Sequence, residues 1–134
     1  MDLFDFQRIA KTDDYEILVH KTKNYMYLSY LGIWDETSQL EYFPEDVRNA
    51  IDSLSRGFNL IIDLLHYRGS KMEHMHLHVE AQKMAIKAGL NKTAVIMFDN
   101  PMLKLTVEYI FKQSGLNAVF LSNVSSAEGW ISIK

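Results

Sequence analysis

The chain contains no cysteine among its 134 residues. It can therefore form no disulfide, and it offers neither a thiolate nucleophile nor a cysteine-ligated zinc site. This absence suits a reducing compartment. The first residues carry acids where a secretory signal needs a basic segment and an apolar run, and no apolar run reaches the roughly 20 residues of a transmembrane helix. We expect a cytoplasmic protein with no membrane span.

Positive charge is also scarce, with 14 lysines and arginines against 17 aspartates and glutamates. Surfaces that bind nucleic acids need a clustered basic excess, so we expect no nucleic-acid partner. The sequence also lacks a nucleophile elbow, a P-loop and a dinucleotide-binding glycine pattern. Nothing in it positively indicates an enzyme, and we expect no cofactor.

Apolar residues, in contrast, are abundant: 48% of the chain is hydrophobic and 12% is aromatic. A chain of this length buries roughly 68% of the surface that its unfolded state exposes, which is enough for one hydrophobic core. Residues 1–14 are mixed and charged, and we expect them to form a loosely held lead-in segment. Residues 15–134 are predicted to form a single domain.

The domain is predicted to open with a β-hairpin. Two runs of β-branched and aromatic residues, at 15–22 and 25–31, are separated by a lysine and by Asn24, which tolerates a positive φ. Gly32 is predicted to end the second strand. Apolar residues that recur every three or four positions then predict a helix from Pro44 to Arg56.

The rest of the chain alternates apolar strands with helices. This order predicts an α/β fold with a mostly parallel, mixed five-stranded sheet, an opening hairpin and about four helices. The remaining strands are predicted at residues 58–64, 93–98 and 116–121, and the remaining helices at residues 70–89, 101–114 and 125–131.

Several helix ends carry recognisable signals. Asn100 and Pro101 suit an N-cap and a first helical turn, and Gly115 suits the end of the same helix. Residues 70–73 and 125–128 both have the serine-to-glutamate spacing of a capping box. The second of the predicted helices is therefore expected to begin at its serine, Ser70.

Together with the hairpin, three segments carry a resemblance to a known superfamily. They are the strand NLIIDL with Asp63 at its end, the helix PMLKLTVEYIFKQSGL closing on Ser-Gly-Leu, and the short terminal helix SSAEGWI. In this order they resemble the STAS or SpoIIAA-like superfamily, the fold of anti-sigma-factor antagonists and of the cytoplasmic tails of sulfate transporters. The resemblance covers roughly residues 15–133.

This resemblance implies a SpoIIAA-like fold and a non-enzymatic regulatory domain. Its partner would be a protein, such as an anti-sigma-like kinase or another protein of a bacterial signalling pathway, and a homodimer stays open. The expected contact surface comprises the second helix, the loop before it and the Asp63 end of the sheet. Its residues are Asp63, His66, Tyr67, Arg68, Ser70, Lys71 and His74.

Ser70 has two interpretations. Phosphorylatable members of the superfamily carry Asp-Ser-Ser-Gly-Leu after the third strand, whereas here seven residues, LLHYRGS, follow Asp63 and end in Ser70. Ser70 is thus the phosphoacceptor candidate, because a phosphate at a helix N-terminus meets free amides and the positive end of the dipole. A capping box explains the same serine without any kinase.

Two other functions stay open. One is a small-molecule or lipid-binding module with a pocket between the aromatic hairpin and the helices. The other is a metal-dependent enzyme, because His74 and His78 lie one helical turn apart and His66 could supply a third ligand. Asp63 and Asp99 both follow apolar strands and are expected at the same sheet edge, where they could bind a cation.

Overall fold

The computed structural model describes residues 5–133. A single mixed sheet forms its centre, and the strands lie side by side in chain order. The first three strands pair antiparallel, and all later pairs are parallel. The strands are β1 (Phe6–Lys11), β2 (Tyr15–His20), β3 (Tyr25–Trp34), β4 (Asn59–Ser70), β5 (Thr93–Ile96) and β6 (Val119–Leu121).

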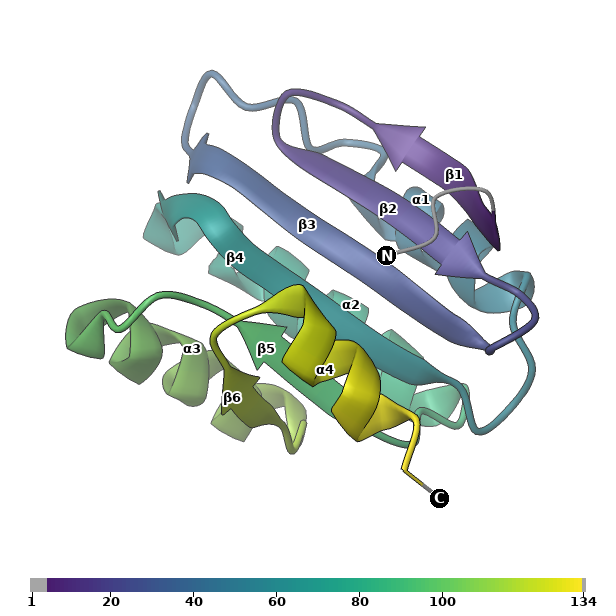
Figure 1. Cartoon of the computed structure of the whole chain (residues 1–134). Helices are drawn as coiled ribbons and strands as arrows, with labels where there is room; N and C mark the ends of the chain where they lie inside the picture. The colour runs from purple at the N-terminus through teal and green to yellow at the C-terminus, as the bar shows by residue number, and fades with distance from the viewer. Residues whose placement is uncertain (1–4, 134) are drawn as a thin grey trace.

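Helices cover both faces of this sheet, unequally. Figure 1 shows the helices labelled α1, α2 and α3 behind the sheet and α4 in front. A short 3-10 turn, η2, links the end of β4 to the second helix. The helical elements are α1 (Phe43–Asp52), η2 (Met72–His74), α2 (Met75–Lys87), α3 (Pro101–Ser114) and α4 (Val124–Ile131). The predicted α/β class with a mostly parallel sheet is confirmed.

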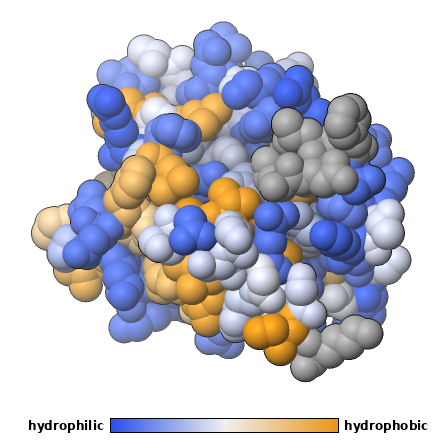
Figure 2. All heavy atoms as spheres, viewed as in Figure 1, coloured by the Kyte–Doolittle hydropathy of each residue, from blue (hydrophilic) through white to orange (hydrophobic). Residues whose placement is uncertain are grey.

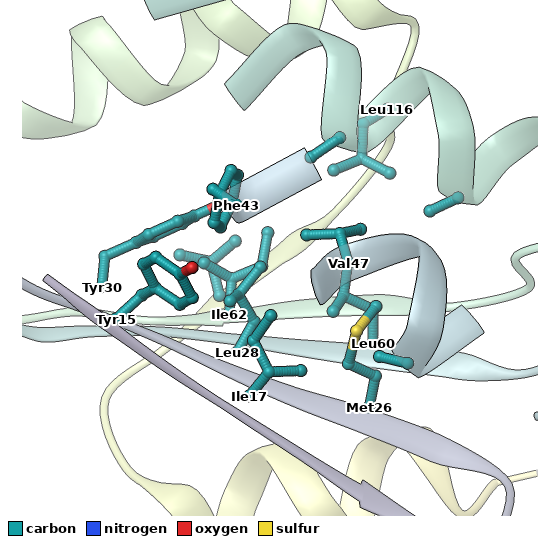
Figure 3. Packing of buried hydrophobic residues seen from close by; sticks show 14 of the residues in the cluster. Tyr15, Ile17, Met26, Leu28, Tyr30, Phe43, Val47, Leu60, Ile62 and Leu116 are labelled. Atoms are coloured by element: carbon teal, nitrogen blue, oxygen red, sulfur yellow. The ribbon is translucent and has the colours of Figure 1, made fainter. Parts of the chain in front are cut away.

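The larger core lies between the sheet and the first three helices. Alternate residues of the central strands point to this side, as the period of two in a strand requires. Figure 3 shows side chains of β2, β3 and β4 meeting Phe43 and Val47 of α1. A smaller cluster on the opposite face packs against Ala127 and Ile131 of α4. Because β4 is covered on both faces, its first half reads as a nearly continuous apolar run.

The sheet has six strands rather than the predicted five. The additional strand, β1, lies within the segment 1–14 that was predicted to be a lead-in, whose first four residues are outside the described part of the chain. β1 is an edge strand that pairs with β2 and has an irregular register between Arg8 and Ala10. An edge strand buries little of its surface, so its sequence lacks a clear alternation of apolar and polar residues.

The predicted turn and cap residues act as expected at three positions. Asn24 has a φ of 57°, and its side chain bridges both backbone groups of Ser55. Asn100 caps α3 by accepting a hydrogen bond from the backbone N–H of Leu103 at 3.1 Å. Gly115 ends α3 with a φ of 86°, which glycine adopts without strain.

The ends of β3 and β4 differ from the predictions. β3 does not stop at Gly32 but continues to Trp34 through an irregular step between Gly32 and Ile33. The longer β3 gives β4 a partner over its second half, so that Trp34 pairs with Ser70. The predicted capping box is therefore wrong: Ser70 ends a strand, and α2 begins only at Met75.

Two other helix limits also shift. α1 ends at Asp52 rather than at Arg56. At α4 the capping residue is Asn123, whose side chain accepts a hydrogen bond from the N–H of Ser126 at 2.8 Å. The box predicted to start at Ser125 is therefore not formed, because an amide two residues earlier already occupies the cap position.

Candidate functional site

A partly buried cluster of three polar side chains lies where β4 meets α2. Ser70 Oγ is 2.9 Å from His78 Nε2, and the Tyr67 hydroxyl contacts both groups, at 3.3 Å from the same nitrogen. A hydroxyl donates one hydrogen bond and can accept others. Tyr67 can therefore donate to Ser70 while Ser70 donates to the imidazole, which ties the end of the strand to the first turns of the helix.

Aromatic rings enclose the imidazole of His78, which is only 3% exposed. It stacks on Trp34 with centroids 4.5 Å apart and meets the edge of Tyr30 at 4.8 Å. Burial lowers the pKa of His78 to about 4, and the positive charge of His74 and His76 lowers it further. The ring is thus neutral near pH 7, and in the tautomer protonated on Nδ1 its Nε2 accepts a hydrogen bond from Ser70.

A small cavity adjoins this cluster between the sheet, α2 and α3. Its volume is about 20 Å³, and its polar lining comes from Tyr30, Tyr67, His78 and Gln82. A water molecule needs at least about 10–15 Å³ by this measure, and ligand pockets typically reach several hundred. This cavity has room for about one water and is too small to be the predicted small-molecule or lipid pocket. Its apolar lining comprises Ile62, Leu64, Val107, Ile110 and Phe111. Larger, open hollows of about 300–380 Å³ lie at the surface, one of them lined by Phe98, Asp99 and Lys104.

The Ser70–His78 pair has the contact expected of an activated nucleophile and its base. A base with a pKa near 4 accepts a proton poorly at neutral pH. The adjoining cavity also leaves no space for a substrate. The geometry therefore favours a structural polar cluster over a catalytic one.

The remaining residues of the expected contact surface are spread over two faces. His66, Arg68 and Lys71 are exposed, and Lys71 forms an ion pair with Glu36. His74 is half-buried, with its Nε2 3.0 Å from the carbonyl oxygen of Asp35. These groups lie around the end of β4, whereas Tyr67 and Ser70 turn inward.

Asp63 lies inside β4 rather than at its end, because the strand continues for seven more residues. On the α4 side of the sheet, its carboxylate accepts hydrogen bonds from the Tyr27 hydroxyl at 2.5 Å and from the Leu65 N–H at 2.9 Å. Both bonds are internal to the fold. Asp99 is exposed in the loop after β5, so the structure assigns the two aspartates different environments.

The histidines do not form a shared metal site. His78 Nε2 belongs to the polar cluster, whereas His74 Nε2 contacts a backbone carbonyl and His66 is exposed on β4. Within residues 5–133, no three His, Asp or Glu side chains are placed to hold a metal ion. The described part of the chain thus gives the metalloenzyme hypothesis no geometric support.

Comparison with known proteins bears on the fold. No protein-family model matches the chain, and no curated protein matches it. Among solved structures, it is similar to an uncharacterised protein of the DUF3478 family from Shewanella loihica, described as having a SpoIIAA-like fold. The TM-score is 0.61 over 91% of this chain and 97% of that one, at 12% identity.

The chain has a SpoIIAA-like fold. The predicted resemblance is thereby confirmed at the level of the fold, and an identity of 12% carries no further information about function. Within the described residues, no helix of the SpoIIAA-like domain is both long and apolar enough to cross a membrane.

Three exposed apolar side chains lie at the carboxyl ends of neighbouring strands of the SpoIIAA-like sheet. Ile33, Met72 and Phe98 are 52%, 81% and 67% exposed, and they lie at or just beyond the ends of β3, β4 and β5. These are neighbouring strands. This edge is at the left of Figure 1, and orange atoms reach the surface along the same side in Figure 2.

The outer side of α3 carries a second exposed apolar row. Met102, Leu105 and Tyr109 are 75%, 64% and 56% exposed. Their spacing of three and four residues places them on one side of the helix.

Sequence reasoning missed both exposed rows and the role of His78. The sequence pattern places Phe98 at the end of a buried strand and Met72 in the first turn of a helix. The signal for His78 was its spacing from Ala81, Gln82 and Ala85, which together form the buried side of α2. That pattern indicates a core histidine rather than a metal ligand.

Proposed function

We propose that this chain is a non-enzymatic, STAS-like regulatory module that binds a protein partner at the carboxyl edge of its sheet. The observation that carries the proposal is the exposure of Ile33, Met72 and Phe98 at the ends of three neighbouring strands. Large apolar side chains exposed at neighbouring strand ends are candidates for a protein-binding surface. The module is expected to act in the cytoplasm.

The surroundings of this edge also suit a protein contact. β4 pairs with β5 only as far as Asp63, so its last residues extend beyond that neighbour. His66, Arg68 and Lys71 are exposed along this extension. An apolar centre with a polar rim is the usual composition of a protein interface. Fold-level analogy suggests a signalling protein, such as an anti-sigma-like kinase of a bacterial pathway, as the partner.

Ser70 takes a structural role in this proposal. Its hydroxyl faces Tyr67 and the neutral His78, not the solvent-facing start of a helix. A phosphate there would bring nearly two negative charges into an aromatic enclosure. Phosphorylation of Ser70 would therefore regulate the module by opening this cluster, and not by presenting a phosphate on a helix N-terminus.

A capture experiment tests the binding surface. The wild-type chain and the double variant Met72→Glu with Phe98→Glu are used as baits in lysate of the native cells. Ile133→Glu is the control, because Ile133 is equally apolar and exposed but follows α4 at the opposite edge of the sheet. We expect the same specific protein with wild type and control, and its loss with the double variant. Retention of that protein by the double variant would contradict the proposal.

A further inference from the structure

α3 has apolar side chains on two opposite sides. Leu103, Val107, Ile110 and Phe111 belong to the side that packs on the core. Met102, Leu105 and Tyr109 form an outer row that faces away from it and is exposed. A helix on the surface of a soluble domain normally has one apolar side and one polar side. The outer row is therefore an apolar surface that no other part of residues 5–133 covers.

Charged side chains run along one flank of the outer row. Lys104, Glu108 and Lys112 recur every four residues, so they lie above one another on the helix, and all three are exposed. Within the described residues none of them forms an ion pair. The amine of Lys104 instead lies 5.0 Å from the ring centroid of Phe120. The alternating charges of Lys104, Glu108 and Lys112 are thus available to a second molecule.

This flank is complementary to itself when two α3 helices pack antiparallel. When the two-fold axis passes near Thr106, a residue that precedes Thr106 by a given number of positions lies level with the residue of the other copy that follows Thr106 by the same number. In antiparallel helix pairs, equivalent flanks also face each other. Lys104 of each copy then faces Glu108 of the other, while the apolar rows meet between them. A parallel pair brings identical residues level and lacks this match.

We propose that two copies of this chain associate through the outer side of α3, antiparallel about a two-fold axis near Thr106. The occupant of the surface is a second copy because the charge order matches itself in this orientation. The proposal concerns a different surface from the carboxyl edge and does not depend on the proposed partner there. Among the helices, α3 packs mainly against α2. Its outer side is therefore available for a second copy.

Sedimentation velocity of the full chain across the micromolar range tests the association. We expect a concentration-dependent dimer for the wild type and a monomer throughout for Leu105→Glu. Lys104→Glu and Glu108→Lys, each alone, should weaken the dimer at least tenfold, since each places like charges opposite each other. The double variant K104E/E108K restores opposite charges and should recover most of the affinity. Ile133→Glu is the control and should dimerise like wild type.

The charge swap keeps the test specific, because a non-specific loss of folding or solubility would not be reversed by the second substitution. Circular dichroism verifies that each variant is folded. A wild-type chain that stays monomeric over this range overturns the proposal. So does a dimer that tolerates Leu105→Glu, or one that the two single charge variants leave unchanged. Binding of a foreign protein by α3 in a chain that stays monomeric likewise overturns it.

A cross-linking experiment locates the axis independently. Because the natural sequence has no cysteine, Thr106→Cys introduces a single thiol next to the proposed axis. A short bifunctional thiol reagent should then join two copies in high yield. Ile133→Cys, whose thiol is exposed at the other end of the molecule, should give only background. Equal yields from the two variants would contradict the proposed interface.

Discussion

The buried imidazole of His78 should make the stability of this domain depend on pH in a defined window. The groups that face it are Tyr67 and Ser70 from β4 and the rings of Tyr30 and Trp34 from β3. No acidic side chain is among them. The pKa of His78 is about 4 in the folded chain, against 6.5 for a free histidine.

The sign of the effect follows from proton binding. Between pH 4 and 6.5 the unfolded chain binds a proton at His78 and the folded chain does not, so the free energy of unfolding rises with pH. This contribution is fully present above about pH 6.5 and is lost as the pH falls through about 4. At about 1.4 kcal/mol per pKa unit, the difference corresponds to roughly 3 kcal/mol. That is a large part of the 5–15 kcal/mol typical of a folded domain.

Urea denaturation of wild type and His78→Gln at a series of pH values measures this contribution. The variant removes the titrating ring, so its unfolding free energy should fall less steeply between pH 6.5 and 4. His66→Gln is the control, because His66 is exposed on β4 and is not among the groups whose charge lowers the pKa of His78. NMR titration of the His78 ring should give a pKa near 4. Identical pH dependence in wild type and His78→Gln would refute the reasoning.

Three further substitutions test the polar contacts of the fold by chemical denaturation. Ser70→Ala should lower the unfolding free energy by about 1 kcal/mol, because it removes one hydrogen bond to His78; phosphopeptide mapping of native protein should find Ser70 largely unmodified. Asp63→Ala should lower it by about 1–3 kcal/mol, since it leaves the buried Tyr27 hydroxyl without its acceptor. Asn100→Ala should lower it by about 1 kcal/mol through loss of the α3 cap.

A specific outcome would contradict each of these three predictions. A fully phosphorylated and stable Ser70 would show that its hydroxyl is accessible and that the cluster is not needed for folding. If Asp63→Ala unfolds with the same free energy as wild type, the hydrogen bond from Tyr27 to Asp63 makes no net contribution to stability. An unchanged Asn100→Ala variant would mean that water or another group satisfies the first turn of α3.

Local signals predicted much of the fold correctly. The hairpin at Asn24, the cap at Asn100 and the end of α3 at Gly115 were all readable, because each depends on the conformational preferences of a few adjacent residues. The capping box at Ser70 was equally regular in sequence but does not form. There a strand pairing with Trp34 competes for the same backbone and prevails.

The candidate site was harder to predict than the fold. His78 was noticed for its spacing from His74, yet its partners are Ser70 and Tyr67 on a strand and the aromatic rings of β3. Such contacts join segments that are distant in sequence, and no local pattern encodes them. The exposure of Met72 and Phe98 was likewise hidden, since an apolar residue looks the same in sequence whether it is buried or not.

The sequence by itself determined the α/β class, the mostly parallel sheet and the resemblance to SpoIIAA-like proteins. These properties follow from periodicity, from buried apolar runs and from the residues that begin and end helices. Only the tertiary structure decided where β3 and β4 end, and hence whether Ser70 caps a helix or ends a strand beside His78. Strand length depends on whether a partner strand continues alongside, which is a property of two distant segments together and not of either one alone.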